Sequence, residues 1–100
     1  MKVSFYARLR PIVGQKSVDI SLPEGATVEQ LVDEVVRRWP ALREYMVDDA
    51  GTLAANVQLC LNGRGVRYLP DGLSTVLEPS HEVDVFPAVA GGLIARATSA

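Results

Sequence analysis

One amphipathic helix between two pairs of strand-like segments constrains the fold more than any other feature of this sequence. Apolar residues between Val28 and Val36 recur at helical spacing, whereas the segments on either side alternate apolar and polar residues with the period of a strand. A helix between two hairpin-like pairs cannot build repeated strand–helix–strand crossovers, so a mixed sheet covered on one face is the better arrangement. The sequence therefore predicts an α+β, ββαββ domain with one main helix. We expect its first and last strands to be parallel central neighbours.

The predicted helix has its own start and stop signals. Thr27 and Gln30 have the spacing of a capping box, in which each side chain bonds to the backbone amide of the other residue. Pro40 ends the helix directly after Trp39, with a short further turn over residues 41–45. Because β-branched valines are mediocre helix formers, we expect burial against the sheet to stabilise this helix more than propensity does.

Alternation and turn residues predict the remaining elements. Strands are expected, in chain order, at residues 3–9, 17–22, 57–61, 66–69 and 82–86. Turns are expected around Gly14, at residues 23–25, at Asn62-Gly63 and at residues 70–72. Residues 48–56 are polar and contain glycine, which is typical of a surface loop.

Composition limits the function as well as the fold. With 48% hydrophobic residues, the chain fits one compact domain with one core. The net charge is −2 and the basic residues are dispersed, so we expect no nucleic-acid partner. No apolar run approaches the roughly 20 residues that cross a bilayer, and the amino terminus lacks a signal-peptide h-region. Cys60 is the only cysteine, which excludes an internal disulfide and thiolate metal sites, so the cytoplasm is the expected compartment.

Side chains in a catalytic arrangement are not evident in the sequence. One histidine, one cysteine and no phosphate-binding glycine loop argue against an independent enzyme. We expect His81 to be exposed and solvated, and Cys60 to be a packing or interface residue, partly exposed, on the sheet face opposite its neighbours. Residues 63–65 lie between strand segments and are interpreted as a turn, not a dinucleotide motif. The remaining unusual feature is Gly91-Gly92, which follows the last strand.

The end of the chain resembles the sulfur carriers of the MoaD/ThiS family. Residues 82–92 read EVDVFPAVAGG, and Phe-Pro-x-Val-x-Gly-Gly is the most specific motif within them. Similar pieces occur in the same order at residues 3–10, 22–28, 39–42 and 61–63. The likeness spans residues 1–92 and is closer to MoaD than to ThiS. It implies a β-grasp (ubiquitin-like) domain over 1–87, a flexible Gly-Gly tail over 88–92 and a carboxyl-terminal extension over 93–100.

The resemblance also implies a role for the two glycines. In such carriers an E1-like adenylyltransferase joins the terminal glycine carboxylate to AMP, and a sulfur donor converts the acyl group to a thiocarboxylate. Gly92 would carry the sulfur, and Gly91 would let the tail pass through a narrow channel. The chain would bind no cofactor or metal of its own, since the activating enzyme supplies ATP and metal.

Partners follow from the same likeness. In the MoaD branch a MoaE-like large subunit uses the sulfur to convert a cyclic pterin precursor to molybdopterin, while thiazole, cysteine and tRNA are alternative acceptors. We expect Tyr6, Phe86, Pro87 and Val89 to contribute to an apolar patch that docks partners. An ordinary core or surface role remains the alternative for Tyr6 and Phe86.

Residues 93–100 depart from the family pattern. Gly92 is followed by Leu93, so it has no free carboxylate, and adenylation cannot begin on an internal peptide carbonyl. The carrier hypothesis therefore requires cleavage after Gly92, for which a JAMM-type metalloprotease is the candidate. Two alternatives keep the tail intact: a β-grasp subunit that binds an oxidoreductase or assembly partner without sulfur transfer, and a carrier homologue that has lost its activity. The single cysteine excludes a ferredoxin-like β-grasp protein.

Overall fold

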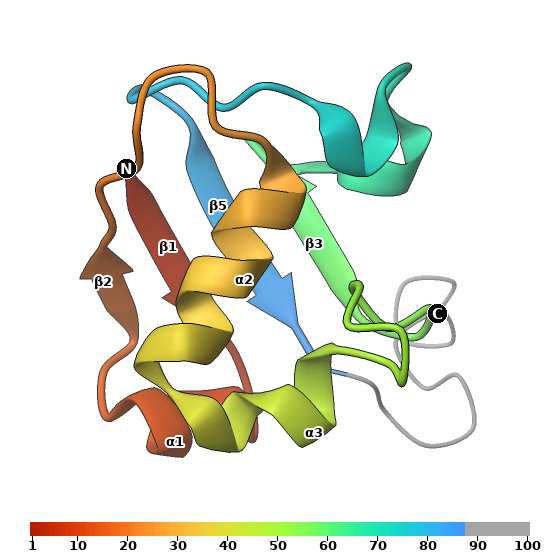
Figure 1. The fold of residues 1–100 in the computed structure, drawn as a ribbon. Helices are drawn as coiled ribbons and strands as arrows, with labels where there is room; N and C mark the ends of the chain where they lie inside the picture. The colour runs from red at the N-terminus through yellow and green to blue at the C-terminus, as the bar shows by residue number, and fades with distance from the viewer. Residues whose placement is uncertain (88–100) are drawn as a thin grey trace, which may run out of the picture.

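The computed structural model describes residues 1–87, so the predictions for Val89, Gly91, Gly92 and residues 93–100 lie outside the described residues. A five-stranded mixed sheet forms the framework, with the strand order β2-β1-β5-β3-β4 (Figure 1). Its strands are β1 (Lys2–Phe5), β2 (Ser17–Asp19), β3 (Gln58–Leu61), β4 (Arg64–Gly65) and β5 (Glu82–Phe86). The helices are α1 (Leu9–Val13), α2 (Val28–Arg38) and α3 (Arg43–Met46), with 3-10 turns at Pro40–Leu42, Val66–Tyr68 and Gly72–Ser74.

The first and last strands are parallel neighbours, which confirms the topological prediction. Val3 lies opposite Val83 and Phe5 opposite Val85, while β2 and β3 flank this pair in antiparallel orientation. Because β1 and β5 run in the same direction, they end at the same edge of the sheet. The segments after Phe5 and after Val85 therefore lie side by side although 80 positions separate those two residues in the chain.

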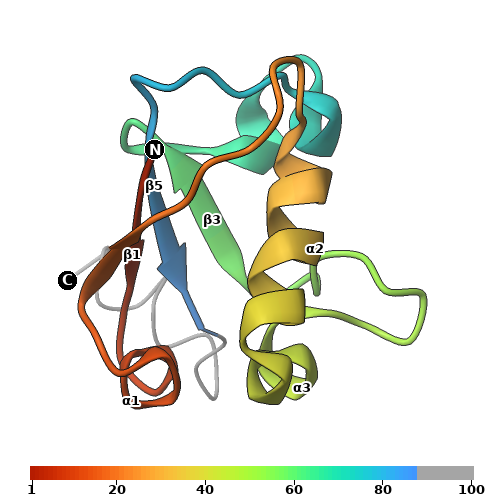
Figure 2. The same cartoon turned by 60° about the vertical axis from the view of Figure 1, so that its left-hand side comes forward.

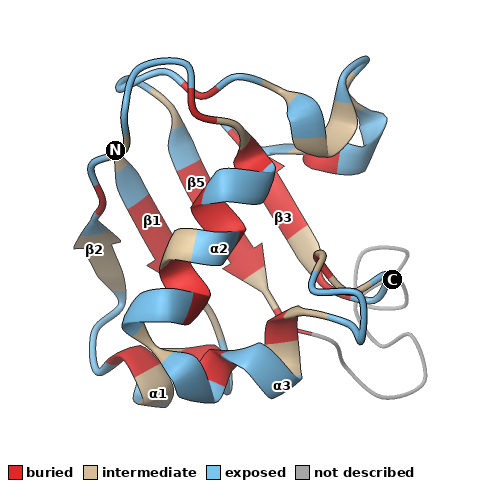
Figure 3. Ribbon diagram, viewed as in Figure 1, coloured by how far each residue is buried: buried red, intermediate tan, exposed pale blue. Residues whose placement is uncertain are grey.

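Helix α2 begins and ends where the sequence predicts. The Gln30 amide donates to Thr27 Oγ1 at 3.3 Å, and the Thr27 amide donates to Gln30 Oε1 at 2.8 Å, so both halves of the capping box are present. The buried side of α2 consists of the five residues of the predicted apolar stripe: Val28, Leu31, Val32, Val35 and Val36. Figure 3 shows that α2 carries both buried and exposed positions, as a helix packed on one side of a sheet does.

The core lies between α2 and one face of the sheet, as Figure 2 shows. Phe5 is fully buried at the end of β1, and the ring of Trp39 meets it edge-on with 5.9 Å between ring centroids. None of the described helices lies over the opposite face, which we call the outer face.

The prediction that the first strand continues to Leu9 is wrong. Strand β1 ends at Phe5, Ala7 adopts a left-handed backbone with φ of 52°, and Leu9 begins α1. Leu9 and Val13 both point into the core from one face of this short helix, which ends at Gly14 with φ of 84°. Leu9 fits the alternation of a strand, but it is the buried first residue of a helix. The strand period and the helix period both place an apolar residue at this position, so alternation could not distinguish them.

Two further strand predictions are wrong in extent or type. Strand β2 covers only Ser17–Asp19 of the second predicted segment, although Ile20 is still fully buried. The predicted strand at 66–69 is a 3-10 turn over Val66–Tyr68, and β4 is instead Arg64–Gly65. The reversal at Asn62-Gly63 is confirmed by positive φ values of 50° and 83°. Since only two residues form this turn, pairing starts immediately at Arg64, earlier than alternation suggested.

Candidate functional site

The outer face of the sheet carries the side chains that alternate with the core residues. Strand register places Asp84 beside Ser4 on β1 and beside Cys60 on β3, and places Gln58 beside Phe86. Tyr6 follows β1 and extends the ladder, because its amide donates to the Val85 carbonyl at 3.2 Å. The face as used below consists of Ser4, Tyr6, Gln58, Cys60, Asp84, Phe86 and, at its β4 edge, Tyr68.

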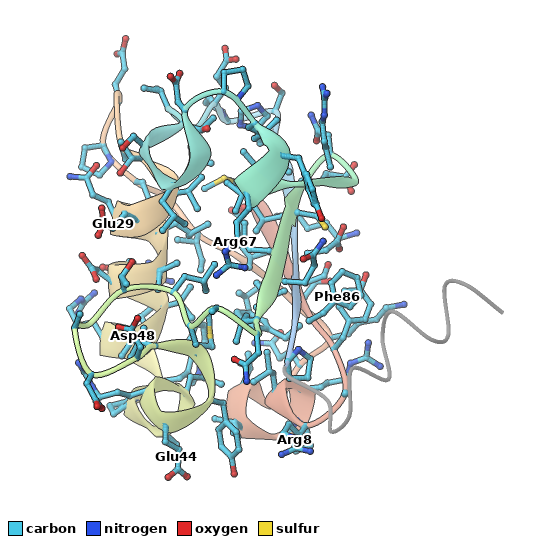
Figure 4. All side chains as sticks on the ribbon, turned by 90° about the vertical axis from the view of Figure 1, so that its right-hand side faces the viewer. Arg8, Glu29, Glu44, Asp48, Arg67 and Phe86 are labelled. Atoms are coloured by element: carbon cyan, nitrogen blue, oxygen red, sulfur yellow. The ribbon has the colours of Figure 1, made fainter. Side chains whose placement is uncertain are left out.

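Tyr6 and Phe86 form an aromatic pair where β1 and β5 end. Their rings are stacked, with 4.4 Å between centroids and 11° between planes. Figure 4 shows Phe86 on the side of the sheet away from α2. The structure thus brings together two of the residues predicted to bind partners, at the root of the tail, whereas Pro87 is buried directly after them. Their role in binding stays a prediction.

Two polar neighbours hold the Tyr6 ring. The Tyr6 hydroxyl donates to Asp84 Oδ1 at 2.9 Å, and the Arg10 guanidinium lies 5.6 Å from the ring centroid. Arg10 Nε also donates to the Phe5 carbonyl at 3.1 Å, which ties α1 to the end of β1. The hydrogen bond to Asp84, and then burial, raise the pKa of Tyr6 above its usual 10.0. Tyr6 is therefore a protonated donor at neutral pH.

The remaining polar side chains of the outer face pair with one another. The hydroxyls of Ser4 and Ser17 share a 2.7 Å hydrogen bond, and Gln58 Nε2 lies 3.9 Å from Cys60 Sγ. Cys60 is only 9% exposed, so it is a packing residue and less exposed than the sequence suggested. Burial raises the pKa of its thiol, which disfavours the reactive thiolate.

Tyr68 is a member of this face that the sequence did not predict. Its side chain is 79% exposed, and a Cβ added to Gly65 would lie 3.0 Å from the Tyr68 ring and 3.0 Å from Gln58 Nε2. Only a residue without a side chain lets the Tyr68 ring lie over β4 beside Gln58. The glycine after the Asn62-Gly63 turn was the available signal. It was missed because residues 66–69 were interpreted as a strand.

Residues outside this face have structural roles. His81 Nδ1 accepts the Glu78 amide at 3.0 Å, so the imidazole closes the turn before β5 and is not simply solvated as predicted. Arg37 and Arg38 lie 2.6 and 2.7 Å from Glu34, and their hydrogen bonds hold its pKa at about 2 on the solvated side of α2.

Two kinds of site are not found in the described part of the chain. Residues 1–87 contain no group of three or more histidine, cysteine, aspartate or glutamate side chains that could hold a metal ion. None of the helices among these residues is long and apolar enough to cross a bilayer.

Comparisons with known proteins agree on one family. The ThiS family model matches residues 3–92. Small archaeal modifier protein 3 of Haloferax volcanii is 35% identical over 92 residues, which cover 92% of this chain and 98% of that protein. The molybdopterin synthase sulfur carrier subunit of Arabidopsis thaliana is 28% identical over 92 residues, which cover 92% of this chain and 82% of that protein.

A solved structure confirms the β-grasp fold. In the crystal structure of the BexX/CysO complex of Amycolatopsis orientalis, the matching chain superposes with a TM-score of 0.73 at 30% identity. The match covers 91% of this chain and 98% of that chain. The mixed sheet with its parallel central pair is thus a ubiquitin-like β-grasp sheet.

Proposed function

This chain belongs to the ThiS family, and on that premise we propose that it is a sulfur carrier and not an enzyme. The observation that carries the proposal is the extent of the family match, which runs through Gly91 and ends at Gly92. The names of the relatives as sulfur carrier or modifier proteins support the general role.

The chemistry we propose for Gly92 is acyl activation followed by sulfur transfer. A carboxylate oxygen of Gly92 attacks the α-phosphorus of ATP on an E1-like adenylyltransferase, and pyrophosphate leaves. A sulfide-level sulfur donor then displaces AMP and leaves a thiocarboxylate, since AMP is a far better leaving group than oxide. The enzyme supplies ATP, metal and positioning, and this chain supplies a glycine whose lack of a side chain permits close approach.

The outer face provides the docking surface in this proposal. Phe86 is the last residue of β5, and Gly92 follows it by six positions. An extended chain spans at most about 3.6 Å per residue, so Gly92 lies within roughly 20 Å of Phe86. A partner bound to Tyr6 and Phe86 can therefore reach Gly92. Insertion of the tail into a partner's active site requires that the start of the tail is held in place and that the tail is short. Val89 is expected to contact the partner next to the aromatic pair, and Pro87, which is buried in the domain, to fix the direction in which the tail leaves it.

Molybdopterin synthesis is the sulfur-consuming pathway we favour, with a MoaE-like large subunit as the second partner. The Arabidopsis relative, named as a molybdopterin synthase subunit, supports this choice. We propose the cytoplasm as the compartment, because the activation step consumes ATP.

Residues 93–100 act in this proposal as a removable block on Gly92. The family match stops immediately before Leu93, and only cleavage of the Gly92–Leu93 bond frees a carboxylate. A JAMM-type metalloprotease is the proposed agent. A β-grasp subunit with an intact tail, which binds a partner without sulfur transfer, is the competing function.

Intact mass spectrometry of the protein from its native cells tests the proposal. We expect a species that ends at Gly92, part of it heavier by roughly 16 Da because sulfur has replaced oxygen. In vitro, a chain that ends at Gly92 should support ATP–pyrophosphate exchange by the E1-like enzyme of the same cells. The chain of 100 residues should not support it. Gly92→Ala in the shortened chain is the matched variant, and it should impair exchange without altering the fold.

Two results would contradict the proposal. One is exclusively full-length protein in cells grown under sulfur demand, which favours the partner-binding subunit. The other is exchange that is equal for the shortened and full chains, which contradicts the blocking role of residues 93–100.

A further inference from the structure

Asp84 is a carboxylate of the outer face that no cation among residues 1–87 pairs with. Asp84 lies half-buried on β5, at the centre of the sheet. A carboxylate can accept about four hydrogen bonds, yet within residues 1–87 the only side-chain hydrogen bond to Asp84 comes from the neutral Tyr6 hydroxyl. No ion pair between residues 1–87 involves Asp84.

The described neighbours of Asp84 do not supply the missing charge, since Lys2, two residues before Ser4 on β1, forms no ion pair with it. Ser4 and Cys60 are small and neutral, and each already pairs with another side chain of the sheet. Arg10 lies beside the aromatic pair, but its Nε donates to the Phe5 carbonyl and its guanidinium lies over the Tyr6 ring. The rest of the face near the tail root is therefore internally satisfied, and Asp84 is not.

Large side chains flank this carboxylate while small ones lie directly beside it. The stacked Tyr6 and Phe86 rings lie at the end of β5, where the tail begins, and Tyr68 lies at the β4 edge against Gln58. In register with Asp84 there are only Ser4 and Cys60, so nothing bulky on β1 or β3 covers it. A partner's side chain could reach the carboxylate between the aromatic groups.

We propose that Asp84 is a specificity-determining residue of the outer face, and that it receives a cationic side chain, an arginine or lysine, of the activating enzyme. The inference rests on the proposed function, because it takes the adenylating enzyme as the partner that covers this face. An arginine fits best, since its planar guanidinium can donate to both carboxylate oxygens while the Tyr6 hydroxyl keeps its own bond.

Desolvation explains why one charge can select partners. A partner that covers the aromatic residues also removes water from Asp84, and a carboxylate buried without a donor is costly. A partner with a cation at this point offsets the cost, whereas one with an apolar or acidic group there is rejected. Tyr6, Phe86 and Tyr68 then supply contact area, and Asp84 decides which surface is accepted.

Asp84→Asn in the chain that ends at Gly92 tests the inference. The amide oxygen still accepts from Tyr6, so the face stays intact while the charge is lost. We expect KM for the carrier in ATP–pyrophosphate exchange to rise at least roughly tenfold with kcat nearly unchanged. The salt dependence of KM should also become flatter. Asp84→Glu should retain part of the affinity, and Asp84→Lys should bind worse than Asp84→Asn.

Glu82→Gln is the matched control. Glu82 lies two residues earlier on β5, on the same face but exposed and farther from the tail root, so its loss should change KM less than twofold. Calorimetric binding of the same enzyme without ATP is measured in parallel for every variant.

The two measurements separate this inference from the proposed function. If the shortened wild-type chain supports exchange and its Asp84→Asn variant does so equally well or better, the role of Asp84 is overturned while the carrier function stands. If no exchange is seen but Asp84→Asn weakens calorimetric binding, the carrier chemistry is contradicted and the role of Asp84 is upheld.

Discussion

Tyr6 shows how single residues define the functional end of this protein. Its ring stacks on Phe86, its hydroxyl donates to Asp84, and the Arg10 guanidinium lies against it. These contacts join β1, α1 and β5 at the point from which the tail departs. One half-buried phenol therefore fixes both the aromatic pair and the carboxylate beside it.

Asp84→Asn should lower the pKa of Tyr6 toward 10.0, because the variant removes the carboxylate that raises it. A group whose pKa is raised on folding stabilises the native state below its unfolded pKa. Here that contribution is present below pH 10 and is lost as pH rises through the higher native value. A pH titration of the Tyr6 ring signals by NMR measures both proteins. A wild-type Tyr6 that titrates at or below 10.0 would contradict the hydrogen bond.

At the scale of elements, the ends of α2 are fixed by local chemistry and its middle by packing. The Thr27–Gln30 capping box satisfies amides at the start, and Pro40 stops the helix after Trp39. Between these ends the valine-rich stripe is buried on the sheet. The helix thus needs the sheet for stability but not for its boundaries.

Thr27→Ala should lower the free energy of unfolding by about 1 kcal/mol, because it leaves the Gln30 amide without its side-chain acceptor. Thr27→Ser keeps a hydroxyl at the same place and should cost much less. Urea denaturation followed by circular dichroism measures the difference. Equal stability of the alanine and serine variants would show that the cap contributes nothing.

At the scale of the whole molecule, one core holds α2 and four of the five strands together, while the outer face is left for partners. The buried cluster includes residues from β1, β3, β5 and each α-helix, such as Phe5, Val13, Val35, Leu59 and Val85, and Val18 of β2 packs against it. Because no second core exists among the described residues, this part of the chain should unfold in a single transition.

Phe5→Ala should cost about 3–5 kcal/mol, because it removes a fully buried ring that contacts Trp39. Tyr68→Ala removes an aromatic ring of similar size from an exposed position and should change stability by no more than about 0.5 kcal/mol. Fluorescence of Trp39, the only tryptophan, and far-UV circular dichroism should report the same transition. Separate transitions for the two probes would argue against a single core.

Features that depend only on neighbours within a few residues could be predicted from the sequence. The cap and apolar stripe of α2, the strand at Glu82–Phe86 and the reversal at Asn62-Gly63 were all predicted, because helical spacing, alternation and turn residues are local signals. Local alternation failed at Leu9, where helix and strand periods coincide.

Which residues form the outer face follows only from how the strands are arranged in the folded chain. Likeness to a family pointed to Tyr6 and Phe86, whereas no signal in the sequence singled out Asp84. The hydrogen bond between Tyr6 and Asp84 joins residues 78 positions apart, and Tyr68 reaches the face only because Gly65 leaves room for its ring. Such contacts depend on which strands are neighbours and in what register, and no periodicity within one segment contains that information.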